Sequence, residues 1–308
     1  MRLLVLGGAV SGLAAARLAR RLGHSVTVYD RRPGAGAELL GEGIGVVEGA
    51  WAAELLDGMD LVVTSPGFPE RSLPVVEALE AGVPLWSEVE FAWRHLDVPV
   101  AAVTGTNGKT TVTELASRML TRSGRRAAAA GNIGSPLSQF VDGDREVLVV
   151  EVSSFQLSFT EAFHPRAAAL LNLAPDHLDW HGSMASYRAS KQRVYLNQTP
   201  DEPLVFDADD PGAVEAVARA PSRLVPVSGR RLPDGGAGVA DRMLRAGPAS
   251  IGLARLATSD PSHLVDLAAA AELAQALGAH PEAVEEEWHS FRPGPHRRTL
   301  VGEWGGIR

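Results

Sequence analysis

The chain has 308 residues, of which 45% are hydrophobic and 21% are charged. This length and composition predict a globular protein of about two domains with buried cores. A formal net charge of −8 argues against a general nucleic-acid or anionic-membrane surface, so a phosphate site has to be local. The absence of cysteine excludes disulfides and thiolate metal sites. We therefore expect a cytoplasmic monomer without a membrane or nucleic-acid partner.

Strands and helices alternate in the first 94 residues. Residues 3–6 are predicted to form a short apolar strand, residues 11–22 a helix and residues 26–29 a second strand. Strand, helix and parallel strand form a βαβ unit. We therefore predict a Rossmann-like domain over residues 1–94, although residues 1–16 alone could pass for a secretory signal.

The turn at residues 7–12 reads Gly-Gly-Ala-Val-Ser-Gly, close to the glycine fingerprint of dinucleotide sites. Ala9 stands where the second glycine normally lets a pyrophosphate approach the backbone, which weakens a dinucleotide interpretation. Asp30 lies near the position where an acidic side chain accepts a hydrogen bond from a ribose hydroxyl, and Arg31 and Arg32 follow it. These residues suit a nucleotide, but a solvated turn explains them equally well.

A third strand over residues 60–64 runs into the turn Ser65-Pro66-Gly67. This turn is expected at the carboxyl end of the sheet, where open α/β sheets bind ligands. A plain structural turn is the alternative.

A second strand-and-helix pattern predicts a central domain over residues 95–293. An apolar strand at residues 98–103 is followed by GTNGKTT at residues 105–111 and then by an amphipathic helix. Backbone N–H groups of such a loop cradle a phosphate, Lys109 neutralises its charge and Thr110 can hold Mg²⁺. The loop is shorter than the standard phosphate-loop pattern, because a valine stands where that pattern has its first glycine.

The strands expected after this loop all end in polar residues, at the edge where α/β sheets bind ligands. They cover residues 127–130, 147–152, 168–171 and 204–206. Glu151 ends a very apolar strand, where a nucleotide hydrolase places a Mg²⁺ carboxylate. His177 lies between two aspartates and is expected beside Glu151, although a lone loop histidine is more often structural. The predicted class is α/β: a Rossmann-like domain, then a P-loop-type, mostly parallel sheet with flanking helices and a small antiparallel extension.

Lys191 is the second of only two lysines in the chain, the other being Lys109. It lies on a helix predicted over residues 184–196, where Tyr187 and Tyr195 share its face. A surface lysine with a buried stem would explain a lone lysine here. In a chain that otherwise uses arginine, we favour a functional amine, because only lysine can lose its proton.

Five segments, in this order and spacing, resemble the Mur ligases, and in particular the branch that adds D-glutamate. They are GTNGKTT at 105–111, GNIGSPL at 131–137, EVSSFQL at 151–157, NLAPDHLDWHG at 172–182 and YRASK at 187–191. In that branch the first domain is Rossmann-like and binds the UDP part of the substrate, which fits the first 94 residues.

The resemblance implies an ATP-dependent amide ligase of peptidoglycan precursor synthesis. The carboxylate of UDP-N-acetylmuramoyl-L-alanine would take the γ-phosphoryl group of ATP, and the amine of D-glutamate would displace phosphate from the acyl phosphate. Positioning and charge neutralisation, with two Mg²⁺ sites, would dominate catalysis.

Matching positions are expected to take four kinds of role. The nucleotide would contact Gly105, Thr106, Asn107, Gly108, Lys109, Thr110, Thr111 and Asn132. The UDP-linked substrate would contact Val10, Ser11, Asp30, Arg31, Arg32, Ser65, Gly67, Ser153 and Gln156. The metal ligands would be Thr110 and Glu151 at one Mg²⁺, and His177 with a modified Lys191 at a second. The catalytic residues would be Lys109, Lys191, His177 and Arg297.

Lys191 matches the position that CO₂ carbamylates in the family. Only a deprotonated amine reacts with CO₂, and the product exchanges a cation for a carboxylate-like anion. A cation beside two Mg²⁺ would be repelled, whereas a carbamate is attracted.

Two segments depart from the family pattern. The family's Gly-x-His-Asn-x-x-Asn motif aligns with residues 261–267, where Leu264 and Leu267 replace both asparagines, which questions adenine recognition from this helix. Residues 294–308 are expected to be a linker and the first strand of a truncated third domain, which in the family carries the D-glutamate site. The chain is therefore expected to bind the UDP-linked substrate, with ATP binding left open, and to ligate poorly or not at all.

Three other functions fit parts of the sequence. An L-alanine-adding Mur ligase is the nearest, but it usually has histidine where Asn107 stands. An NADP-dependent oxidoreductase would use Arg31 and Arg32 and leave the phosphate loop idle. A nucleotide-binding regulator without chemistry would need no third domain.

Overall fold

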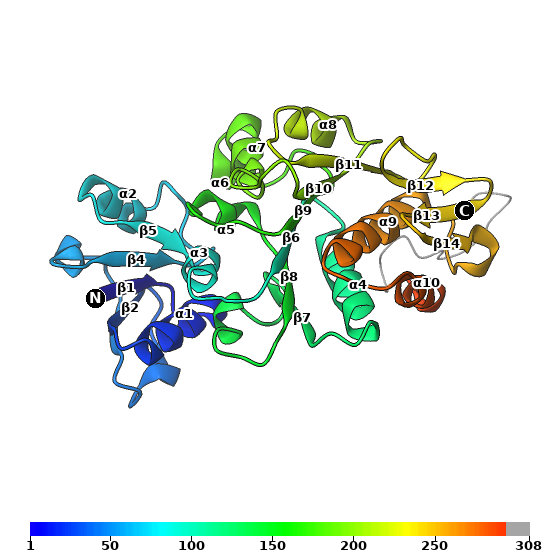
Figure 1. Cartoon of the computed structure of the whole chain (residues 1–308). Helices are drawn as coiled ribbons and strands as arrows, with labels where there is room; N and C mark the ends of the chain where they lie inside the picture. Colours follow the sequence, from blue (N-terminus) through cyan, green and yellow to red (C-terminus); the bar gives the residue numbers. More distant parts are fainter. Residues whose placement is uncertain (294–308) are drawn as a thin grey trace, which may run out of the picture.

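The computed structural model describes residues 1–293, which build two α/β sheets joined by a short helix (Figure 1). The first sheet has five parallel strands in the order β3-β2-β1-β4-β5. Its elements are β1 (Arg2–Leu6), α1 (Val10–Arg21), β2 (Ser25–Asp30), β3 (Gly45–Glu48), β4 (Leu61–Thr64), α2 (Leu73–Glu80) and β5 (Leu85–Ser87). The Rossmann-like prediction is confirmed, whereas the short edge strands β3 and β5 were not predicted.

The turn between β1 and α1 requires its glycines. Gly7 has a φ of +110°, and a Cβ atom at Gly12 would lie 1.8 Å from the carbonyl oxygen of Gly7. The substitution at Ala9 is accommodated, because Ala9 takes the extended conformation of a helix N-cap. The chain therefore makes a tight strand-to-helix turn without the second glycine of the dinucleotide fingerprint.

The second sheet has nine strands in the order β14-β13-β12-β11-β10-β9-β6-β8-β7. It is parallel from β7 to β12, and the hairpin β12-β13-β14 adds the antiparallel extension. The strands are β6 (Val100–Thr104), β7 (Ala127–Gly131), β8 (Val147–Glu151), β9 (Ala167–Leu170), β10 (Pro203–Asp207), β11 (Arg223–Ser228), β12 (Ala237–Ala240), β13 (Met243–Ala246) and β14 (Ala249–Gly252). The helices are α4 (Lys109–Arg122), α5 (Ser154–Ser158), α6 (Leu178–His181), α7 (Met184–Gln192), α8 (Pro211–Val217), α9 (Pro261–Ala276) and α10 (Pro281–Ser290). The predicted α/β class is confirmed.

Two cores cover the two faces of this sheet. Alternate residues of β6 point to opposite faces, so Ala101 and Val103 join a cluster with α4, α9 and α10, while Ala102 joins the other cluster. That second cluster also contains Leu3 and Val28 of the first sheet. The two sheets therefore share a continuous apolar core, which fixes the first sheet against the second.

Helix α3 (Glu88–Trp93) lies between the two sheets and carries a fully buried carboxylate, Glu90. Its two oxygens accept hydrogen bonds from the N–H groups of Glu161, Ala162 and Phe163 at 2.9–3.0 Å. Arg94 Nε donates to the same carboxylate at 2.6 Å. This side chain therefore ties the connection between the sheets to the loop after α5, while the domain boundary expected after residue 94 stays a prediction.

Among residues 1–293, the helices are all too short or too polar to cross a membrane. Residues 294–308, on which the predicted linker, opening strand and Arg297 fall, lie outside the described part of the chain.

Candidate active site

The loop between β6 and α4 is preformed for an anion. Gly105 and Gly108 have φ angles of +152° and +83°, and a Cβ atom at Gly108 would lie 2.5 Å from Oδ1 of Asp266. Asn172 holds the loop from the side: it accepts from the N–H of Asn107 at 2.8 Å and donates to the carbonyl of Asn107 at 3.1 Å. The N-terminus of α4 thus faces a cavity with free space for a phosphate chain.

The two lysines converge on one backbone carbonyl of this loop. Lys109 Nζ lies 3.1 Å from the carbonyl oxygen of Gly105, and Lys191 Nζ lies 2.8 Å from the same atom. Lys191 is almost fully buried, and Tyr187 lies under its ammonium group at 4.8 Å. Burial lowers the pKa of Lys109, and burial together with the Lys109 charge lowers the pKa of Lys191 to about 7. Lys191 thus lies against the phosphate loop, while its predicted catalytic and metal-binding roles stay predictions.

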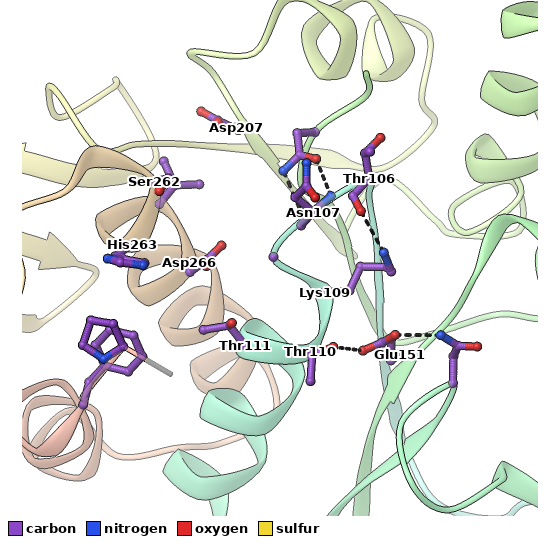
Figure 2. A pocket seen from close by; sticks show the side chains of 16 residues that line it. Thr106, Asn107, Lys109, Thr110, Thr111, Glu151, Asp207, Ser262, His263 and Asp266 are labelled. Atoms are coloured by element: carbon purple, nitrogen blue, oxygen red, sulfur yellow. Dashed lines mark hydrogen bonds between the residues drawn. The ribbon is translucent and has the colours of Figure 1, made fainter. Parts of the chain in front are cut away.

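Glu151 lies at the end of β8 and connects two loops. Its carboxylate accepts a hydrogen bond from Thr110 Oγ1 at 2.7 Å (Figure 2). It accepts another from Asn132 Nδ2 at 2.9 Å. Only 3% of Glu151 is exposed. A carboxylate and a hydroxyl beside a phosphate cradle are oxygen donors of the kind that Mg²⁺ prefers. Thr110 and Glu151 would therefore be able to hold a Mg²⁺ ion.

A second metal ligand set is not assembled in residues 1–293, where no three His, Asp or Glu side chains gather as a cage. His177 does not line the phosphate cavity: its ring packs on Phe155 with centroids 4.8 Å apart, and its Nε2 lies 3.4 Å from Asp176. Its backbone has a left-handed φ of 50° at the N-cap of α6. The second Mg²⁺ site at His177 and Lys191 stays a prediction.

The cavity at the phosphate loop measures about 620 Å³. All the residues predicted to bind nucleotide line it except Gly105. Sequence reasoning assigned no role to five further polar residues of its wall, which are Asn172, Asp207, Ser262, His263 and Asp266. The signal for Asn172 and Asp207 was their place at the polar end of a strand.

Helix α9 presents polar side chains to the cavity and apolar side chains to the core. Leu264 and Leu267 lie in the core with 2% and 0% exposure, so they do not correspond to nucleotide-facing asparagines. His263 and Asp266, three residues apart on one helix face, line the cavity instead. Two polar residues of this helix thus line the cavity, while its contacts to a nucleotide base stay a prediction.

Ser153 and Gln156 form a capping box at the start of α5. Ser153 Oγ accepts from the N–H of Gln156 at 3.2 Å, and Gln156 Oε1 accepts from the N–H of Ser153 at 3.0 Å. Both side chains are buried and bonded to each other. Their observed contacts position α5, and direct substrate contacts stay a prediction.

The first sheet carries its own cavity, of about 830 Å³, at the carboxyl ends of β1, β2 and β4. All seven residues of this sheet that were predicted to hold the UDP-linked substrate line it, namely Val10, Ser11, Asp30, Arg31, Arg32, Ser65 and Gly67. Its aromatic wall of Tyr29, Trp51 and Phe68 was not predicted. Tyr29 packs edge-on against Trp51 with ring centroids 4.9 Å apart, and tilted against Phe68 at 6.2 Å.

Both carboxylate oxygens of Asp30 accept hydrogen bonds from donors of the first domain itself. Its oxygens accept from the N–H groups of Gly8 and Arg32, both at 2.9 Å, and from the Arg32 guanidinium at 3.1–3.2 Å. Burial raises its pKa, but these hydrogen bonds outweigh burial and lower the pKa to about 2. The carboxylate thus fixes the turn that lines the cavity.

Family models match both sheets of the chain. The Mur ligase middle domain matches residues 103–231, and the MurD-like N-terminal domain of Mur ligases matches residues 1–87. With the phosphate loop and the Glu151–Thr110 pair, these matches define the class: the chain belongs to the Mur ligase family and is a ligase.

The relatives within this family are more specific. The chain is 40% identical to a UDP-N-acetylmuramoylalanine–D-glutamate ligase of Shouchella clausii, covering 99% of this chain and 69% of that protein. It is 41% identical to the same ligase of Frankia casuarinae, over 99% of this chain and 67% of the relative.

Solved structures share the fold at lower identity. A Neisseria UDP-N-acetylmuramate:L-alanyl-γ-D-glutamyl-meso-diaminopimelate ligase is 17% identical, with a TM-score of 0.65 over 95% of this chain and 98% of that one. The UDP-N-acetylmuramate–alanine ligase of Thermotoga maritima is 18% identical, with a TM-score of 0.54 over 99% and 72% of the two chains.

Proposed function

We propose that the chain binds UDP-N-acetylmuramoyl-L-alanine and ATP and activates the substrate carboxylate for amide formation with D-glutamate. The observation that supports this best is the Thr110–Glu151–Asn132 chain of hydrogen bonds, because it joins the phosphate loop to a second loop that lines the same cavity. The identity of 40% to a D-glutamate-adding ligase supports the choice of amino acid.

The reaction has two steps in which the described residues act mainly by position and charge. A substrate carboxylate oxygen attacks the γ-phosphorus of ATP, an O–P bond forms, and ADP leaves. Lys109 and the loop N–H groups hold the phosphates, and Mg²⁺ bound by Thr110 and Glu151 would supply further charge neutralisation. The D-glutamate amine then attacks the acyl carbon, the C–O bond to phosphate breaks, and the amine proton passes to solvent.

Lys191 is proposed to act as a carbamate. Its neutral amine attacks CO₂, a C–N bond forms and a proton is released, so a buried cation becomes an anion. A buried amine that is partly neutral near pH 7 favours this step. The carbamate would remove one of the two cations that now compete for the Gly105 carbonyl.

Positional isotope exchange tests the first step directly. ATP labelled with ¹⁸O at the β,γ-bridge should scramble its label only when UDP-N-acetylmuramoyl-L-alanine is present. UDP-N-acetylmuramate in its place distinguishes the L-alanine-adding alternative. Binding of both ligands without exchange under any condition would contradict the enzyme and support a regulator.

Two variants test the carbamate. Lys191→Ala should lose most of the exchange and regain part of it with added formate or acetate, because a small carboxylate can fill the vacated space. Lys191→Arg retains a cation, which should prevent both exchange and rescue. Full exchange by unrescued Lys191→Ala would contradict the proposal.

A further inference from the structure

Asp207 ends β10 at the carboxyl edge of the central sheet and lines the phosphate-loop cavity. In Figure 2 it lies on the same side of the loop as Ser262, His263 and Asp266, whereas Lys109 and Glu151 lie on the other side. The cavity therefore has a cationic, metal-binding end and an opposite end with carboxylates. A nucleoside triphosphate has the matching polarity, with its anionic γ-phosphate far from a hydroxyl-rich ribose.

Local structure does not require a charge at Asp207. Its Oδ1 accepts a hydrogen bond from the N–H of Asp209 at 2.9 Å, which closes the turn after β10. An asparagine oxygen would make the same bond. Burial raises the pKa of Asp207 to about 6, and Asp209 and Asp210 oppose its ionisation further. The turn thus uses one oxygen of a carboxylate that lines the cavity, so the wall offers an acceptor to a ligand there.

The end of the cavity far from Lys109 is lined by aromatic rings that suit a nucleotide base. His263 and Phe291 both line it, with ring centroids 6.0 Å apart. Aromatic faces hold a base by stacking, and stacking is tolerant of base identity. A base there and phosphates at the loop leave the ribose between them, at the wall to which Asp207 belongs.

We propose that the Asp207 carboxylate accepts hydrogen bonds from the ribose hydroxyls of the bound nucleotide and makes the site selective for ribonucleotides. This inference rests on the proposed nucleotide site at the phosphate loop. A carboxylate at a strand end that accepts from a ribose hydroxyl is an established solution in open α/β sheets. Removal of one hydroxyl would leave the desolvated carboxylate without its partner.

Asp209 supplies a matched control two residues away. It is also an aspartate of the same turn, but it does not line the cavity, and its Oδ2 accepts from Ser228 Oγ at 2.6 Å. Asp207→Asn and Asp209→Asn therefore make the same chemical change inside and outside the proposed contact. Thermal unfolding of both variants checks that each is folded.

The test is calorimetric titration of the whole chain with Mg²⁺ and ATP, 2′-deoxy-ATP, 3′-deoxy-ATP or inosine triphosphate. The wild type should bind ATP about tenfold more tightly than the deoxy analogue that lacks the contacted hydroxyl. In Asp207→Asn the two affinities should become equal, mainly because ATP binds more weakly. Asp209→Asn should keep the tenfold difference.

If the wild type and Asp207→Asn prefer ATP over the deoxy analogue by the same factor, the inference is overturned while the nucleotide site stays intact. Discrimination against inosine triphosphate that disappears in Asp207→Asn, with no effect of the ribose hydroxyls, would also overturn it and assign Asp207 to the base. Failure of the wild type to bind ATP would overturn the inference together with the nucleotide site.

Discussion

Asp30 and Asp207 occupy equivalent places in the two sheets, at the carboxyl ends of β2 and β10, yet their pKa values move in opposite directions. Asp30 has two backbone donors and a guanidinium, and its pKa falls to about 2. Burial raises the pKa of Asp207 to about 6, because this carboxylate has only one backbone donor to offset it and two acidic neighbours that add to the shift. The difference indicates that the first sheet uses its carboxylate to build the cavity wall, whereas the second keeps one for a ligand.

Removal of the Glu90 carboxylate should have the largest effect on stability. This buried carboxylate between the sheets accepts hydrogen bonds from three backbone N–H groups and from Arg94. Glu90→Ala leaves three buried N–H groups and Arg94 without their acceptor. We expect the free energy of unfolding to fall by about 3 kcal/mol in urea denaturation. The control Glu161→Ala removes an exposed partner of Arg94 and should cost less than about 1 kcal/mol. Similar values for the two variants would show that Glu90 does not join the sheets.

Asp30→Asn should have an intermediate effect that depends on pH. The folded-state pKa is depressed, so the ionised carboxylate stabilises the fold above its ordinary pKa, and this contribution is lost as pH falls from about 4 to about 2. We expect a loss of about 1–2 kcal/mol at pH 7 and a flatter acid limb in pH-dependent denaturation. An unchanged acid limb would mean that Asp30 is not held as the structure shows.

Asp207→Asn should have the smallest effect on stability, with the opposite sign. The folded-state pKa is raised, so ionisation reduces stability as pH rises from about 4 to about 6. The variant should therefore be slightly more stable than the wild type at pH 7, by less than about 1 kcal/mol because solvent screens part of the charge. Chemical denaturation of both proteins at pH 4 and pH 7 measures this difference in the free energy of unfolding. A variant less stable than the wild type at pH 7 would contradict the opposite roles of Asp30 and Asp207.

Site residues could be predicted from the sequence where a short segment is enough to define the local structure. The GTNGKTT loop and Glu151 were found from local patterns, and the resemblance to the Mur ligases added the seven residues that line the first-sheet cavity. Ser153 and Gln156 were found too, but their spacing is also that of a capping box, which is the role that the structure shows.

The residues that sequence reasoning missed depend on strand order and helix phase. Asp207 reaches the phosphate loop because β10 pairs with β9, which pairs with β6, an arrangement that chain order does not reveal. His263 and Asp266 were missed because the side of α9 that faces the cavity depends on how the helix packs, and one residue along a helix turns its face by about 100°. The aromatic wall at Trp51 lies in an irregular segment without periodicity.

The central claim, that each sheet binds a different part of the reaction's substrates, is tested most directly by two single variants and two ligands. Arg31 is exposed at the first cavity and Lys109 lies at the second. Calorimetric titration of UDP-N-acetylmuramoyl-L-alanine and of ATP with Mg²⁺ should show that Arg31→Ala weakens only the UDP-linked ligand, by about tenfold. Lys109→Ala should weaken only ATP, by about a hundredfold. Loss of both ligands in either folded variant, or of neither in both, would contradict the account.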